Sequence, residues 1–230
     1  MSEKHTGADL VANALDQLGV EHVFAIVSIH NMPMLDAINR LGKTKIIDVR
    51  HEQAGTHAAD GYARMSGKAA ANLLHLGPGL GNAFANIHNA KKARTPMLNI
   101  VGDHATYHLK YDAPLTSDLD GLAKASSDWV GRSKSPDDLS DLGAQAWKAA
   151  HKYPGQIATM LVPADSAWGE TEKLGKELVS EGPLDIDNSL LTDAYNVLSS
   201  EKNTMLFIGG DCLDEAVSYT HLRAHETIAD

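Results

Sequence analysis

The feature that most constrains this chain is a short strand that runs directly into an Ala-rich helix. Residues 45–49, Lys-Ile-Ile-Asp-Val, are rich in β-branched side chains, as strands are. The residues that follow, up to Met65, are rich in Ala with one late Gly, which is typical of a buried helix. Glu52 lies at the junction, on the edge where α/β folds bind ligands. Position alone explains it equally well as a first-turn acid favoured by the helix dipole.

Strands and helices are expected to alternate from residue 6 to residue 162. The expected strands are residues 21–26, 45–49, 69–76, 97–101, 129–130 and 156–162. The expected helices are residues 6–18, which open on a Thr6–Asp9 capping box, a helix with Pro33 in its first turn, and residues 52–65, 80–94 and 136–151. Residues 69–76 are apolar on both faces, as buried parallel strands are. The pattern predicts an α/β fold, a doubly wound parallel sheet with helices on both faces.

Residues 50–64 carry the most specific motif. They read Arg-His-Glu-Gln, then small residues, then Ala-Asp-Gly-Tyr-Ala-Arg. This strongly resembles the pyrimidine-binding domain of thiamine-diphosphate enzymes of the acetolactate synthase and benzoylformate decarboxylase group, from about Gly7 to Trp168. The resemblance implies that Glu52 hydrogen-bonds a ring nitrogen of the cofactor's aminopyrimidine and so activates the cofactor. A carboxyl group suits this role, because Asp would be one methylene too short and Gln could not take up the proton.

A glycine-rich loop is expected at residues 75–82, His-Leu-Gly-Pro-Gly-Leu-Gly-Asn. Its spacing is superficially that of a dinucleotide loop, but the third glycine falls on an Asn and no suitable acidic residue follows about twenty positions on. In the thiamine family, Gly-Pro-Gly followed by Asn marks a loop that packs beside the cofactor and shapes the subunit interface. The resemblance therefore implies that Gly77, Pro78, Gly79 and Asn82 join Glu52 in binding the cofactor.

His75 lies at the carboxyl end of a central strand, next to this loop. A histidine there is well placed for proton transfer at neutral pH. It also falls where benzoylformate decarboxylase-like enzymes carry a catalytic histidine. The alternative is a core histidine with a backbone partner.

Two further loops are expected at the ligand edge, after residues 21–26 and 97–101. They contribute the candidate substrate contacts Ile29, His30, Asp103, His104, Pro114 and Leu115. Both loops depart from the family pattern. Residues 26–28 read Ile-Val-Ser where Gly-x-Pro-Gly is usual, and Asp103 stands where true acetolactate synthases usually have Gln. The departures favour one alternative function, a benzoylformate decarboxylase-like 2-ketoacid decarboxylase, and a further alternative is a non-catalytic binding module of the same fold.

Charge and cysteine content exclude several classes of function. The net charge is −10 with no basic patch, so nucleic acid is not an expected partner. Cys212 is the single cysteine, which rules out an internal disulfide and favours the cytoplasm. No apolar run is long enough for a signal peptide or a membrane span. His51 and His57 invite a metal interpretation, but on a helix they point about 120° apart, so no metal is expected.

Four regions are expected: a pyrimidine-binding domain at residues 1–168, a charged linker at 169–187, the start of a truncated central domain at 188–216, and a tail at 217–230 that resembles a sequencing adapter. In the central domain, a helix is expected at residues 190–200 and a strand at 205–208. The resemblance implies thiamine diphosphate as cofactor, Mg²⁺ bound by a C-terminal domain outside this chain, and room for FAD in the full-length protein. It also implies a 2-ketoacid substrate, a homodimer or homotetramer, and no turnover by the fragment alone.

Overall fold

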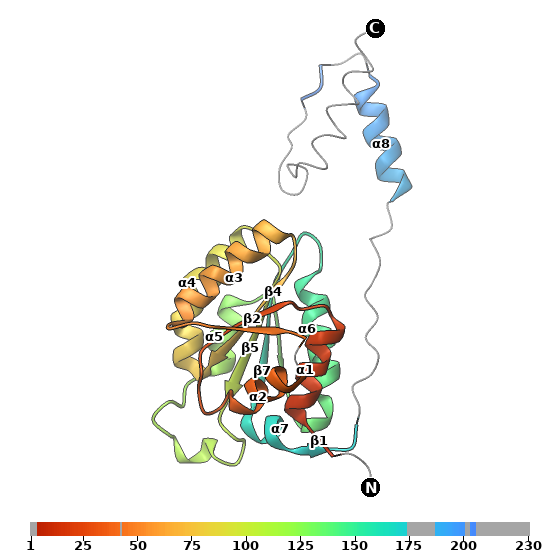
Figure 1. Ribbon diagram of the computed structural model, residues 1–230. Helices are drawn as coiled ribbons and strands as arrows, with labels where there is room; N and C mark the ends of the chain where they lie inside the picture. The colour runs from red at the N-terminus through yellow and green to blue at the C-terminus, as the bar shows by residue number, and fades with distance from the viewer. Residues whose placement is uncertain (1–3, 42, 174–186, 201–202, 206–230) are drawn as a thin grey trace. The chain divides into compact units, whose positions relative to one another are not determined.

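The computed structural model describes residues 4–41, 43–173, 187–200 and 203–205 (Figure 1). The chain divides into two compact units, Met1–Glu181 and Gly182–Asp230. In the second unit, the predicted helix is observed as α8 (Asn188–Leu198). Residues 206–208 of the predicted final strand, Cys212 and the tail 217–230 lie outside the described residues.

The first unit is built on one parallel sheet, which confirms the predicted fold class. Its strands are β2 (His22–Ala25), β3 (Lys45–Asp48), β4 (Ala70–His75), β5 (Met97–Asp103), β6 (Trp129–Arg132) and β7 (Ile157–Pro163), in the order β3-β2-β4-β5-β7-β6. Every neighbouring pair is parallel. The direction in which the chain adds strands reverses between β2 and β4. Sheets of this kind bind ligands at the carboxyl ends of the strands, outside such a reversal.

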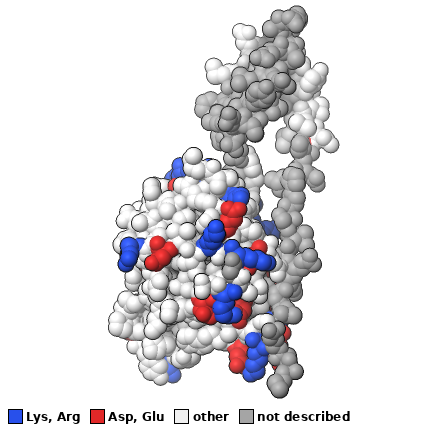
Figure 2. All heavy atoms as spheres, viewed as in Figure 1, with Lys and Arg blue, Asp and Glu red and all other residues white. Residues whose placement is uncertain are grey.

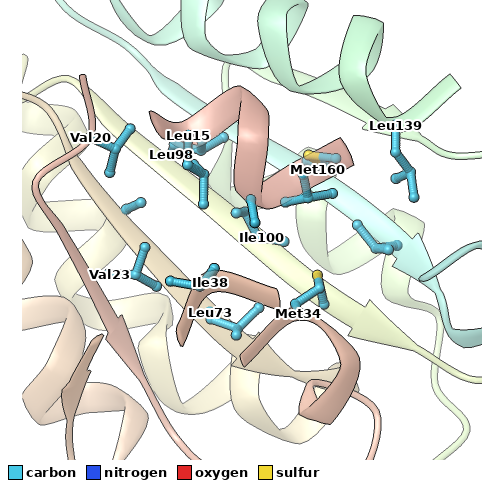
Figure 3. Packing of buried hydrophobic residues seen from close by; sticks show 14 of the residues in the cluster. Leu15, Val20, Val23, Met34, Ile38, Leu73, Leu98, Ile100, Leu139 and Met160 are labelled. Atoms are coloured by element: carbon cyan, nitrogen blue, oxygen red, sulfur yellow. The ribbon is translucent and has the colours of Figure 1, made fainter. Parts of the chain in front are cut away.

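Helices cover both faces of the sheet because successive strand residues point to opposite sides. One face carries α1 (Gly7–Gln17), α2 (Met32–Leu41) and α6 (Leu139–Ala150), and the other carries α3 (Glu52–Ser66), α4 (Leu76–Lys92) and α5 (Leu119–Ser126). In β4, Ala71 and Leu73 face the first layer, and Ala70 and Leu74 face the second. Figure 3 shows the first of these cores, with side chains of the helices packed on the central strands. The shorter helices are η1 (Leu109–Tyr111), η2 (Pro136–Asp138) and α7 (Ala164–Trp168).

The two ends of this unit are tied together by a short antiparallel pair, β1 (His5–Thr6) with β8 (Glu170–Thr171). The sequence predicted only a charged linker from residue 169. Polar residues can still form this pair, because backbone hydrogen bonds at a sheet edge need no apolar side chains. Thr6 and Asp9 form the predicted capping box at the start of α1.

The predicted loop at residues 75–82 is wrong. Helix α4 begins at Leu76, so Gly77, Pro78 and Gly79 lie in its first turn rather than in a loop before Leu80. Proline is tolerated there because the first turn of a helix needs no N–H from it. Leu76 absorbs the sharp turn out of β4 by adopting a left-handed backbone conformation, with φ of 53°.

Acidic and basic side chains lie interspersed over the face of the molecule shown in Figure 2. Among the described residues, no helix combines the length and the apolar character needed to cross a membrane.

Candidate functional site

Glu52 is the first residue of α3, at the carboxyl edge of the sheet. The residue before it, His51, caps the helix: its Nδ1 accepts a hydrogen bond of 3.2 Å from the Gln53 N–H. Glu52 is only 7% exposed. A buried carboxyl group is costly unless it has polar partners, so its surroundings decide its role.

One such partner is Asn82 on α4. Its Nδ2 donates a hydrogen bond of 3.1 Å to Glu52 Oε2. Gly79 lies beside the other oxygen, because a Cβ added at Gly79 would be 3.0 Å from Glu52 Oε1. Asn86 fastens the two helices by donating to the Gln53 carbonyl at 2.7 Å. The structure thus brings together Glu52, Gly79 and Asn82, whose association the sequence motifs had implied.

The other two residues predicted to bind the cofactor are Pro78 and Gly77. Pro78 is exposed. Gly77 is buried and packs against Ser117, whose side chain occupies the space that a Cβ would need. Gly77 therefore lets the loop before α5 approach α4.

A narrow crevice runs from Glu52 towards the sheet. Its lining is mainly apolar and comprises Phe24, Ile26, Val49, Glu52, Gly55, Thr56, Asn72, Leu73 and Leu74. Glu52 therefore borders a crevice whose walls are mainly apolar side chains.

These residues fit an aminopyrimidine ring. Asn82 fixes one oxygen of Glu52, and within the described part of the chain no hydrogen bond ends on Oε1. Oε1 lies next to a glycine, where a flat ring can approach without meeting a side chain. A carboxyl group held in this way can share a proton with a weakly basic ring nitrogen.

Three histidines form a cluster at the same sheet edge. The ring of His30 lies 5.3 Å from that of His75 and 4.7 Å from that of His104, measured between centroids. Nδ1 of His30, Nδ1 of His75 and Nε2 of His104 are buried and have no hydrogen-bond partner in the described structure. The histidine cluster, as we call these three residues, therefore encloses three ring nitrogens that nothing in the described structure satisfies.

Burial lowers the pKa of both His30 and His75 below the ordinary value near 6.5. For His30, the positive charges of His104 and His75 lower the pKa further, against the opposing effect of Asp103. For His75, Glu52 acts to raise the pKa, and the positive charge of His104 acts to lower it. A neutral imidazole at pH 7 can accept a proton, so His75 is suited to the predicted transfer.

Asp103 is bound within the protein. Its carboxylate accepts a hydrogen bond of 2.7 Å from the His104 N–H. It also forms an ion pair of 2.6 Å with Arg132, which pairs with Asp120 as well. Asp103 thus holds the backbone of His104 in place. Sequence reasoning missed Arg132, although a basic residue at the carboxyl end of a predicted strand was a usable signal.

Sequence reasoning also did not identify Asn31 as a residue of the site. It is fully buried, and its Nδ2 donates to the Leu74 carbonyl at 3.2 Å. Its side chain passes directly over Gly102, where a Cβ would collide with it. Asn31 therefore fixes the loop that carries His30 against β4 and β5.

The remaining candidates are at the surface. Ile29 is 77% exposed and Leu115 is 41% exposed, and Pro114 is exposed as well. In the described part of the chain, no group of three or more His, Cys, Asp or Glu residues is arranged to hold a metal ion.

Comparison with known proteins agrees with this geometry. Residues 5–125 match the family model described as thiamine pyrophosphate enzyme, N-terminal TPP binding domain. The chain is 41% identical over 208 residues to the putative acetolactate synthase large subunit IlvX of Mycobacterium tuberculosis, covering 89% of this chain and 39% of that protein. It is 28% identical over 236 residues to the acetolactate synthase isozyme 3 large subunit of Escherichia coli, covering 98% of this chain and 40% of that protein. The chain thus spans less than half the length of these relatives.

Proposed function

The chain belongs to the thiamine pyrophosphate enzymes, as their N-terminal TPP-binding domain, and we propose that it forms the aminopyrimidine side of the cofactor site in an acetolactate synthase-like enzyme. The observation that carries the proposal is Glu52, a buried carboxyl group held by Asn82 on one oxygen and bordered by Gly79 at the other. A helix-terminal acid with only a dipole role would need neither contact.

Thiamine diphosphate, when bound, supplies a nucleophilic carbon that makes or breaks a carbon–carbon bond next to the carbonyl of a 2-ketoacid. The role of Glu52 is to hold a proton at Oε1 and share it with the pyrimidine ring. Asn82 keeps the carboxyl group from rotating, and the apolar crevice behind it keeps competing water away.

His75 has a second role, which is to move a proton to or from the substrate. It ends β4 at the ligand edge of the sheet and is only half-buried, and its lowered pKa leaves the ring neutral at pH 7. The same observation favours the second candidate function, a decarboxylase acting on an aromatic or branched 2-ketoacid.

The rest of the active site lies outside this chain in the proposal. The matched relatives are more than twice as long as the aligned stretch, and the described residues offer no metal-binding cluster. The additional length would hold the diphosphate through Mg²⁺ and leaves room for FAD. The fragment alone is then expected not to turn over.

A second copy of the chain is the proposed partner. Gly61 on α3 and Gly81 on α4 are exposed, and no atom lies within 4 Å of a Cβ built on either. Glycine inside a helix costs about 1 kcal/mol relative to Ala, and packing within the described chain does not explain it. Close approach of another subunit to these two helices would explain it.

Product analysis with the complete enzyme tests the function. An acetolactate synthase joins two ketoacids, whereas a decarboxylase releases an aldehyde. Formation of either product should depend on thiamine diphosphate and be lost in Glu52→Gln. Cofactor-independent activity, or no loss in this variant, would contradict the proposal.

A further inference from the structure

The histidine cluster has a property that a single catalytic histidine would not have. His30 contacts the rings of both His75 and His104, and the three come from different segments: the loop after β2, the end of β4 and the residue after β5. Imidazoles in such contact cannot all be charged without strong repulsion. Their protonation is therefore coupled.

The surroundings limit how much positive charge the cluster can hold. All three unpartnered ring nitrogens are buried, and His104 is buried as a whole residue while His30 and His75 are half-buried, so water offsets repulsion between protonated rings only in part. Asn31 and Asp103 fix the backbone on either side, which prevents the rings from moving apart. The charged or titratable groups that face the cluster are Glu52 from α3, Asp103 from β5 and its partner Arg132 from β6, Asp120 from α5 through Arg132, and His108 from the following loop.

These groups do not cancel the repulsion within the cluster. Asp103 is already paired with Arg132, and His108 would add positive charge on its own protonation. Glu52 favours a proton on His75, but in the proposed function its own proton is shared with the cofactor. Asp103 and Asp120 share the single cation Arg132, so one negative charge remains near the cluster and favours its first proton, whereas a further proton meets the repulsion of the first.

We propose that His30, His75 and His104 act as one electrostatically coupled unit, and that His30 and His104 are positioning residues which keep His75 free to accept a proton. This deepens the proposed function and rests on it for the role of His75 in catalysis. The coupling itself concerns only this chain and does not depend on the cofactor.

Proton transfer then follows a definite order. While the cluster is neutral, His75 takes a proton from the substrate side and becomes an imidazolium. Its charge then disfavours a proton on His30, whose ring it contacts. When His75 returns the proton, the cluster is neutral again and no atom has been gained or lost.

NMR titration of the ligand-free chain with ¹³C-labelled histidine tests the coupling. In the unmodified chain, His75 should titrate along a shallow curve that departs from a single-site shape. In His104→Asn, the curve should sharpen and its midpoint should rise, because the positive charge of His104 acts to lower the pKa of His75. His104→Phe keeps the volume of the ring and should give the same rise, so a packing defect in one variant does not decide the result. His30→Asn should act in the same direction.

His57→Asn is the matched control, because His57 is exposed on α3 and lies outside the cluster. It should leave the His75 curve unchanged. A single-site His75 curve with the same midpoint in the unmodified chain, His104→Asn, His104→Phe and His30→Asn would overturn the proposal.

The pH profile of the complete enzyme separates this proposal from the proposed function. If His75 acts as a base, the acidic limb of kcat/KM should move to higher pH in His104→Asn by the amount found by NMR. An NMR shift without a shift in the profile would refute the catalytic part and leave the coupling intact. If Glu52→Gln is inactive but the NMR titrations show no coupling, the coupling is refuted and the proposed function stands.

Discussion

Asn82 Nδ2 lies 3.1 Å from Glu52 Oε2 and joins the second turn of α4 to the first residue of α3. The two residues are 30 positions apart in the chain, and both follow strands of the same sheet edge. The contact fixes the Glu52 carboxyl group in one orientation.

Glu52→Gln should preserve the fold and remove most of the cofactor activation, because an amide accepts the Asn82 bond but cannot exchange a proton. Loss of a proton-sharing group commonly costs about 100-fold to 10,000-fold. Hydrogen exchange at the reactive carbon of the cofactor, followed by NMR in heavy water with the complete enzyme, measures this. Glu21→Gln is the control, since Glu21 is a surface carboxylate bound to Tyr62 and Lys68. An unchanged exchange rate in Glu52→Gln would make Glu52 a helix-terminal acid only.

Gly79→Ala should impair the same step without unfolding the chain. Its Cβ would press on Glu52 Oε1 from 3.0 Å, and displacement of a catalytic group by a few tenths of an ångström should slow exchange about 10-fold. Gly81→Ala, two positions further on, meets no atom within 4 Å and should stabilise the isolated chain by about 1 kcal/mol. Urea denaturation and the exchange assay compare the two variants. Equal exchange rates would contradict the prediction.

Asn99→Leu should destabilise the chain by about 1–3 kcal/mol. The Asn72 Nδ2 donates to Asn99 Oδ1 at 2.9 Å, and Asn99 in turn donates to Thr159 at 3.3 Å, all of them buried within the sheet. Removing Asn99 alone leaves Asn72 without its partner. The double variant Asn72→Leu/Asn99→Leu should therefore cost less than the sum of the two single changes in urea denaturation. If the two single losses of stability are strictly additive, the hydrogen-bonded residues Asn72 and Asn99 do not act as a unit.

Asp9→Asn should destabilise the chain at pH 7 by about 1 kcal/mol and have little effect near pH 3. Burial acts to raise the Asp9 pKa, but hydrogen bonds from Thr6 and Arg40 outweigh it and lower the pKa below 3.8. A lowered carboxyl pKa stabilises the fold above the unfolded-state pKa, and this is lost as the pH falls through the folded-state pKa. Asp36→Asn, which changes the exposed partner of the same Arg40, should have a small effect at either pH. A loss of equal size at pH 3 would argue for packing rather than charge.

Stability should also fall as the pH drops below about 6.5, because the pKa values of His30 and His75 are lowered in the folded chain. Above this pH both residues are neutral in the folded and unfolded chain. Below it, the unfolded chain binds protons that the folded chain resists. The double variant His30→Gln/His75→Gln should lose less stability than the parent between pH 7 and pH 5.5 in urea titrations. His57→Gln should lose as much stability as the parent over this pH range. Parallel curves of stability against pH for the parent and the double variant would contradict the lowered pKa values of His30 and His75.

The sequence alone determined the fold class and the location of Glu52. Alternating β-branched and Ala-rich segments are local patterns, and local patterns decide where strands and helices form. The capping box at Thr6 and Asp9 was predictable for the same reason, since its two residues are three positions apart. The start of α4 was not, because the left-handed backbone at Leu76 depends on how the helix packs on the sheet.

Only the tertiary structure decided which side chains meet at the site. His30, His75 and His104 were each candidates, but they follow three different strands, and their ring contacts depend on strand order. The sequence made Asp103 a candidate substrate contact, and only the tertiary structure pairs its carboxylate with Arg132. Such contacts join residues that are far apart in sequence, and they form only because a doubly wound sheet gathers the carboxyl ends of its strands along one edge.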